Sequence, residues 1–233
     1  MANKNKYVDF VSDEDFLKCV KWVCEAYPTD SEEIDMKKLQ KNTIDPFKLI
    51  FDIINGELQT DEWISSERIR QNDKTINNRI GEFHQKLLGK VNGWVDLGVG
   101  DDSKVDLMKS DKSIFIELKN KFNTMNSDST DKCRDKLEMA VRNNPKVKAY
   151  WAFLVSKNGD SGDIIWKKGG KSDERIRKVW GSKVYELVTG DPKALEKTWK
   201  ALALAIKDLR KSEFSINEIE MTKLLEFFNY AFH

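Results

Sequence analysis

The sequence predicts a mixed α/β (α+β) fold whose core runs helix, three strands, helix, strand, with a central mixed sheet flanked by helices. Three stretches support this prediction. Apolar residues recur at helical spacing through 74–91, apolar and polar residues alternate through 113–121, and a nearly continuous apolar run fills 147–156. The first pattern has the period of an amphipathic helix, the second that of a half-exposed strand, and the third is typical of a strand buried on both faces. We expect helical extensions before and after this αβββαβ core.

The composition is that of a globular protein. Its 233 residues are 39% apolar and 10% aromatic, which suffices for one well-packed core. The formal net charge is only +1, but residues 1–63 hold 14 acidic and 8 basic side chains, a balance of −6, so the remaining 170 residues carry +7. This asymmetry is compatible with a basic body that faces nucleic acid, and equally with an unevenly charged solvated surface.

The cysteines and the hydropathy bear on the compartment. Cys19, Cys24 and Cys133 show no metal-ligand spacing with the two histidines, and we interpret them as buried or incidental thiols in a reducing environment. No apolar run is long enough to span a bilayer, and the first residues lack the apolar core of a signal peptide. We therefore expect a cytoplasmic protein with no membrane partner.

Three helices are expected near the N-terminus, over 13–27, about 32–41 and from Pro46 to just before Gly56. In the third, proline occupies a favourable first-turn position. Large apolar residues recur on one face of it: Phe47, Ile50, Phe51 and Ile54. We interpret this region as a scaffold or as a contact between two subunits.

The helix over 74–91 precedes the most informative stretch of the chain, and one or two helices are expected between it and residue 61. Glu82 and Gln85 lie beside its apolar stripe. On the residues alone, Glu82 is an exposed glutamate that pairs with Lys86 at i, i+4.

A pattern of charged residues in 104–121 predicts a reactive site. Two strand-like runs flank a polar turn, and in the second run Glu117 and Lys119 project from the face opposite the aliphatic residues. An antiparallel hairpin would bring Asp106 beside Glu117. Such a patch suits metal-assisted phosphodiester hydrolysis, because Mg²⁺ takes oxygen ligands, usually one or two carboxylates with waters and a substrate phosphate. The alternative is a solvated hairpin face with a cross-strand ion pair.

A further strand is expected over 93–99, before a polar turn at 100–103. It contains Asp96, which is a rival for the first acid because it could lie across a sheet from Asp106. The spacing to the Glu-x-Lys pair favours Asp106.

Asp106, Glu117 and Lys119 resemble the motif of the PD-(D/E)XK nuclease superfamily, in which an acid, a variable spacer and Glu-x-Lys lie on adjacent strands. Val105 stands where that motif usually has proline, at a position that varies. The run ELKNKFNTMN over 117–126 is more specifically similar to type II restriction endonucleases that cut short G/C-rich sites of the GGNCC kind. The resemblance is clearest over about 68–204.

This resemblance implies a restriction-endonuclease-like fold and Mg²⁺-dependent hydrolysis of double-stranded DNA at a short palindromic site, leaving 5′-phosphates. It implies that Asp106, Glu117 and the Leu118 carbonyl hold the metal, that Lys119 positions the attacking water, and that Glu82 supports the site through metal or water. It assigns no chemistry to histidine, so His84 is expected to be an exposed or partly packed helix residue.

The implied organisation is a helical N-terminal extension over 1–63 and a nuclease domain with DNA-recognition elements over 64–233, packed together as one compact unit. The implied partners are double-stranded DNA, a second copy of the chain in a homodimer, and a cognate DNA methyltransferase that protects host DNA.

Two segments after the reactive strand are candidates for DNA contact. The first consists of short polar side chains that either bond phosphate and base edges or form a turn and a helix cap: Asn123, Thr124 and Asn126. The second is strongly basic and either contacts phosphates and guanine edges or forms a plain surface loop: Lys167, Lys168, Lys171, Arg175, Arg177 and Lys178.

The remaining elements are a helix over 129–143, a short strand over 163–167, a helix opening at 191–192 and a final helix over 216–230. The apolar stripes of the last two are expected to be core, or to bury against a second subunit. These stripes are Leu195, Trp199, Leu202, Ile206 and Leu209, and Ile219, Leu224, Phe227 and Phe228.

Two other functions fit the same core. A structure-selective repair or recombination nuclease would prefer branched or single-stranded DNA over a defined duplex sequence. A non-cleaving DNA-binding module would retain the fold without the chemistry, and the intact set of two acids and a lysine argues against it.

Overall fold

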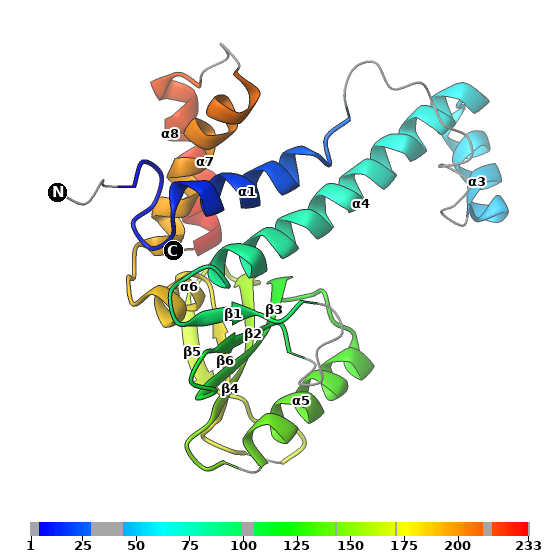
Figure 1. Cartoon of the computed structure of the whole chain (residues 1–233). Helices are drawn as coiled ribbons and strands as arrows, with labels where there is room; N and C mark the ends of the chain where they lie inside the picture. The colour runs from blue at the N-terminus through cyan, green and yellow to red at the C-terminus, as the bar shows by residue number, and fades with distance from the viewer. Residues whose placement is uncertain are drawn as a thin grey trace. The chain divides into compact units, whose positions relative to one another are not determined.

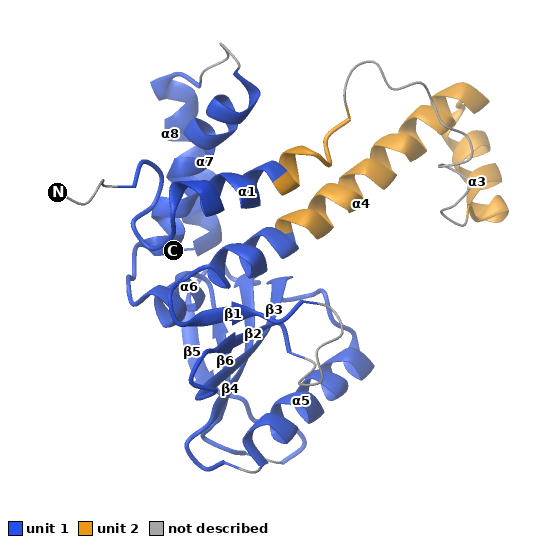
Figure 2. Ribbon diagram, in the orientation of Figure 1, with its two compact units in different colours: residues 1–21, 81–233 blue, residues 22–80 orange. Residues whose placement is uncertain are grey.

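The computed structural model describes residues 5–28, 44–98, 105–142, 144–170, 172–211 and 216–232. The chain divides into two compact units, residues 1–21 with 81–233 and residues 22–80, which Figure 2 shows in different colours. The division expected from the sequence, into an extension over 1–63 and a nuclease domain over 64–233, stays a prediction. The expected helix at 32–41 and the turn at 100–103 lie outside the described residues.

The unit of residues 22–80 contains α3 (Pro46–Gly56) and the first part of α4 (Thr60–Leu88). The Asp45 side chain caps α3 by accepting hydrogen bonds from the amides of Phe47 (2.9 Å) and Lys48 (3.4 Å). The predicted third helix is thus confirmed. The chain forms one continuous helix, α4, from residue 60 to 88, where one or two separate helices were expected before the helix predicted at 74–91.

In the other unit, six described strands form one mixed sheet in the order β1-β2-β3-β4-β6-β5 (Figure 1). These are β1 (Trp94–Asp96), β2 (Leu107–Lys109), β3 (Ile114–Lys121), β4 (Lys148–Val155), β5 (Gly162–Ile165) and β6 (Ile176–Trp180). The central strands β3, β4 and β6 are parallel to one another, and the outer pairs β1–β2, β2–β3 and β5–β6 are antiparallel. The parallel pairing of β3 with β4 is possible because α5 (Ser127–Arg142) connects them.

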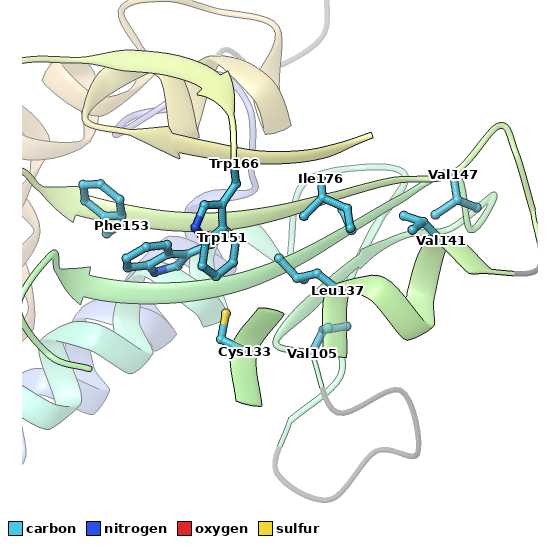
Figure 3. Packing of buried hydrophobic residues seen from close by; sticks show 10 residues of the cluster. Val105, Cys133, Leu137, Val141, Val147, Trp151, Phe153, Trp166 and Ile176 are labelled. Atoms are coloured by element: carbon cyan, nitrogen blue, oxygen red, sulfur yellow. The ribbon is translucent and has the colours of Figure 1, made fainter. Parts of the chain in front are cut away.

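The element order α4, β1, β2, β3, α5, β4 confirms the αβββαβ core read from the sequence. Every residue of β4 from Ala149 to Leu154 is buried, as its continuous apolar run predicts. The core under α5 joins Leu137 and Val141 of the helix to Trp151 of β4 and Ile176 of β6 (Figure 3). The sheet carrying the candidate site is therefore fixed on one face by α5.

Two elements were not predicted. Ile176–Trp180 forms β6, where a basic loop was one of the two interpretations, and Ser182–Thr189 forms α6. The sequence pattern does not indicate this strand, because charged residues occupy its centre. Arg177 pairs with Asp163 of β5, and Lys178 lies over the rings of Trp151 and Trp166. A period-two pattern is not visible when both alternating positions hold cations.

The predicted helices at both ends of this unit are confirmed as α1 (Asp13–Cys24), α7 (Ala194–Arg210) and α8 (Glu218–Phe232). Their buried faces differ in part from the prediction. In α7 the small residues Thr198, Ala201 and Ala205 fill the core, while Ile206 is exposed. In α8 only Phe228 of the predicted stripe is buried among the described residues. Close helix packing favours small side chains at the contact, which a search for large apolar residues misses.

None of the described helices combines the length and the apolar composition that crossing a lipid bilayer requires.

Candidate active site

The β2–β3 hairpin sets the geometry of the candidate site. Leu107 pairs with Ile116 in register, and the Asp106 amide donates to the Ile116 carbonyl at 3.0 Å. Asp106 therefore lies directly before β2 and opposite Glu117, which the alternation along β3 turns to the same face as Lys119. The short polar turn predicted from the sequence closes this hairpin.

The structure brings the three motif residues together. The Lys119 ammonium donates to Glu117 Oε1 at 2.8 Å and lies 3.5 Å from Asp106 Oδ2. The same Asp106 oxygen accepts a 2.7 Å hydrogen bond from the Leu118 amide. A backbone donor and a lysine thus hold the first carboxylate, and the lysine joins it to the second.

Burial governs the electrostatics of this cluster. Glu117 is only 4% exposed. Burial raises the pKa of Asp106 above its ordinary value, and the neighbouring Glu117 adds to this, while Lys119 opposes it. Burial alone would lower the pKa of Lys119, but the Asp106 and Glu117 carboxylates together outweigh burial and raise it. Lys119 therefore remains an ammonium at neutral pH.

A second lysine, Lys136 of α5, belongs to the cluster and was not predicted. Its ammonium lies 3.2 Å from each oxygen of the Glu117 carboxylate. The contact spans 19 residues, so no local motif contains it. The helical period of α5 does give one indication of its position. Lys136 directly precedes the fully buried Leu137, so it lies at the edge of the helix face that packs on the sheet.

Cys133, one turn before Leu137 on α5, is also close to these charges. Burial, reinforced by the Glu117 carboxylate, raises the pKa of the Cys133 thiol to about 12. The thiol is therefore protonated and unreactive at neutral pH, as expected for a buried structural cysteine.

The rival acid Asp96 lies on the neighbouring edge strand, opposite Leu107. Its Oδ1 accepts hydrogen bonds from Gln85 Nε2 of α4 (2.7 Å) and from the Gly98 amide (2.9 Å). The same Gln85 nitrogen lies 3.4 Å from the Asp106 carbonyl oxygen. Gln85 thus links α4, Asp96 and the first residue of the motif, whereas Glu82, three residues earlier on α4, is exposed.

The donor set fits a hard divalent cation. Asp106 and Glu117 offer two adjacent carboxylates, and the Leu118 carbonyl belongs to the same strand, which is the oxygen chemistry that Mg²⁺ takes. Within the described ranges no group of three or more His, Cys, Asp or Glu side chains could hold a metal ion. Waters and a substrate phosphate would therefore have to complete the coordination of an ion held by these two carboxylates.

The short polar residues after β3 have local partners. Asn126 caps α5, because its Oδ1 accepts from the Ser129 amide at 2.8 Å. Thr124 Oγ1 donates to the Lys121 carbonyl at 2.8 Å, which is a turn contact. Asn123 is exposed. A DNA contact by these three residues stays a prediction.

Most of the basic candidates are engaged within the protein. Lys168 pairs with Asp131 (2.5 Å), Arg175 with Asp173 (2.7 Å) and Arg177 with Asp163 (2.7 Å). Burial lowers the pKa of Lys178. Lys167 is exposed and, with Lys178, lines a surface pocket of about 500 Å³, and Lys171 lies outside the described residues. Contact of the paired cations with DNA would require exchange of these partners and also stays a prediction.

His84 packs on Phe83 and Tyr185, and its Nδ1 lies 2.8 Å from the Tyr185 hydroxyl. Burial lowers the pKa of His84 from 6.5 to about 4. The unfolded chain therefore binds a proton at His84 before the folded protein does, so stability is expected to fall as the pH drops from about 6.5 to about 4. Melting temperatures over this range, for the wild type and His84→Asn, check this expectation. The variant should lose less stability, and equal losses would contradict the buried neutral state.

Comparisons with known proteins agree in the family they indicate. The family model described as Eco47II restriction endonuclease matches residues 8–211. The type II restriction enzyme Sau96I of Staphylococcus aureus is 33% identical over 216 residues, which cover 88% of this chain and 81% of that enzyme. The type II restriction enzyme Eco47II of Escherichia coli is 34% identical over 216 residues, which cover 86% of this chain and 87% of that enzyme.

Proposed function

The chain belongs to the Eco47II family of type II restriction endonucleases, and from this premise we propose that it cuts double-stranded DNA at a short palindromic G/C-rich site of the GGNCC kind, using Mg²⁺ and leaving 5′-phosphates. The observation that supports the proposal is the partly buried cluster of Asp106, Glu117 and Lys119 on the β2–β3 hairpin.

Each member of the cluster has a proposed role. Asp106, Glu117 and the Leu118 carbonyl would hold the metal, which when bound polarises the scissile phosphate and lowers the pKa of the attacking water. Lys119, an ammonium whose pKa is raised, orients the attacking water and balances charge that develops on the phosphate. Glu82 is proposed to support the site through a water, since α4 also carries Gln85 to the Asp106 main chain.

A palindromic site is cut in both strands by two active sites related by a twofold axis, so we propose a homodimer. The α3 strip is the surface proposed for this contact: Phe47, Ile50, Phe51 and Ile54, whose exposed fractions run from 54% to 75%. The charged residues Lys48 and Asp52 of α3 pair with each other, and Asp52 also accepts from Trp63 of α4, so this pair adds no net charge to the helix.

The area of the strip is consistent with the centre of a dimer contact. Its two phenylalanines alone expose on the order of 250 Å². A stable interface buries about 800 Å² per partner, with an apolar centre and a polar rim. A second copy would bring an identical strip against this one, because a twofold interface uses the same patch on both subunits.

Phe51→Glu is expected to weaken this dimer. A carboxylate buried in an apolar contact costs several kcal/mol, so the dissociation constant should rise at least about a hundredfold. Light scattering would then give the mass of one chain, 27.0 kDa, in place of twice that value. Ile69→Glu, at a residue of α4 that is 70% exposed, is the matched control and should remain dimeric. A dimeric Phe51→Glu protein would contradict the assignment of the α3 strip.

Plasmid and phage-sized duplex DNA, incubated with the protein in Mg²⁺ or in EDTA, test the proposed activity. Discrete and reproducible bands only with Mg²⁺ are expected, and sequencing their ends would give the site and the position of the phosphate. DNA modified by a cognate methyltransferase should resist cleavage. A smear, or cutting restricted to branched substrates, would favour a repair-type nuclease, and retarded but uncut DNA would favour a binding module.

A further inference from the structure

Lys136 contacts the candidate site differently from Lys119. Lys119 reaches one oxygen of Glu117, at 2.8 Å, and also approaches Asp106. The Lys136 ammonium lies 3.2 Å from each of the two Glu117 oxygens, and it comes from a different element, α5. Both oxygens of the buried carboxylate that would bind a metal are therefore in contact with one ammonium from outside the hairpin.

The formal charges of the cluster balance without a metal. Asp106 and Glu117 contribute two negative charges, and Lys119 and Lys136 contribute two positive charges within 3.5 Å of them. A divalent ion between the carboxylates would leave an excess of two positive charges if both lysines stayed. Like charges at such distances repel strongly in a buried setting, so one ammonium has to withdraw.

The two lysines differ in their freedom to withdraw. Lys119 follows Glu117 by two residues on the same strand and is also bound near Asp106. The Lys136 side chain is 30% exposed, whereas that of Glu117 is 5% exposed. A lysine has a flexible four-carbon stem, so the partly exposed Lys136 ammonium can move into solvent or to a DNA phosphate without unfolding α5.

We propose that Lys136 is a positioning residue that competes with the divalent cation for the Glu117 carboxylate. It holds the buried carboxylate in place while no metal is bound, and it gives up this contact when the metal binds. The inference rests on the proposed metal site and adds to it a residue outside the Asp–Glu–Lys motif. It makes metal binding an exchange of one cation for another at Glu117.

Calorimetric titration of the full-length protein with Mg²⁺, in the absence of DNA, tests this exchange. Lys136→Ala removes the competing cation and is expected to bind Mg²⁺ about tenfold more tightly or better. Its metal-free form should melt at a lower temperature than the wild type, because Glu117 loses a partner, and Mg²⁺ should raise its melting temperature by more. Lys136→Arg should restore wild-type or weaker Mg²⁺ binding, since a guanidinium pairs with both oxygens of a carboxylate.

Two further variants make the result decisive. Lys132→Ala removes the same charge from an exposed position one turn earlier on α5 and should leave Mg²⁺ affinity unchanged. Lys136→Gln keeps a donor for Glu117 without the charge, so it gives the same test if Lys136→Ala does not fold. Unchanged or weaker Mg²⁺ binding in folded Lys136→Ala or Lys136→Gln would overturn the proposal.

Glu117→Ala separates this inference from the proposed function. If Glu117→Ala loses Mg²⁺ binding while Lys136→Ala and Lys136→Gln bind as the wild type does, only the role of Lys136 is wrong. If Glu117→Ala also binds Mg²⁺ as the wild type does, the proposed metal site itself is wrong.

Discussion

Lys119→Ala is expected to lower the rate of DNA cleavage by on the order of 10² to 10³, because it removes the cation that contacts both carboxylates and is proposed to balance the developing charge. The fold should persist, since Glu117 keeps the Lys136 ammonium. Single-turnover cleavage at saturating Mg²⁺ measures the loss, and gel retardation in EDTA measures whether DNA binding remains.

The matched control for this change lies on the same strand. Lys121→Ala removes an exposed lysine two residues later, on the same side of β3, and should cut at close to the wild-type rate. Glu117→Ala should lose cleavage to a similar or larger extent than Lys119→Ala, because it removes a proposed metal ligand. Cleavage by Lys119→Ala at the wild-type rate would contradict the proposed mechanism.

Leu137→Ala is expected to lower the free energy of unfolding of the sheet-containing unit by about 2–5 kcal/mol. Leu137 is fully buried and lies in the core between α5 and the sheet, close to Val105 and Ile176 (Figure 3). Truncation leaves a cavity between α5 and the sheet, which can close only if the helix or the strands move. Urea unfolding followed by tryptophan fluorescence measures the change.

Met139→Ala is the control for this loss. Met139 lies two residues later on the same helix and is 61% exposed, so its truncation should change stability by less than about 0.5 kcal/mol. Cleavage by Leu137→Ala, measured well below its unfolding midpoint, should stay near wild type because no charged group of the site is altered. A loss below about 1 kcal/mol would mean that α5 is not anchored by this core.

The sequence predicted those parts of the site that depend on local periodicity. Alternation along 113–121 placed Glu117 and Lys119 on one face, and the short turn brought Asp106 opposite Glu117, as the hairpin register shows. Lys136 could not be found in this way, because its contact depends on how α5 lies on the sheet. Non-local contacts of this kind are set by packing, which no spacing rule encodes.

The same distinction between local and non-local contacts explains what was missed in the prediction of the fold. Strand β6 has lysine and arginine at its centre, and these are tolerated only because Asp163 and two tryptophan rings receive them from other elements. The buried face of α7 consists, apart from Leu195, of small residues, which suit close packing against the neighbouring helix α6. In both cases tertiary partners outweigh the local pattern that sequence reasoning uses.

The Leu118 amide donates to Asp106, and this has a consequence for how residue 118 can change. The leucine side chain points away from the charges and is buried, so substitutions at 118 report on core volume and not on the carboxylate. The proposed metal contact of this residue is likewise a main-chain oxygen. Apolar side chains of similar size can therefore replace Leu118 without changing what this residue contributes to the site. Removing the backbone N–H, by Leu118→Pro or by an amide-to-ester exchange, would instead remove the hydrogen bond that holds Asp106.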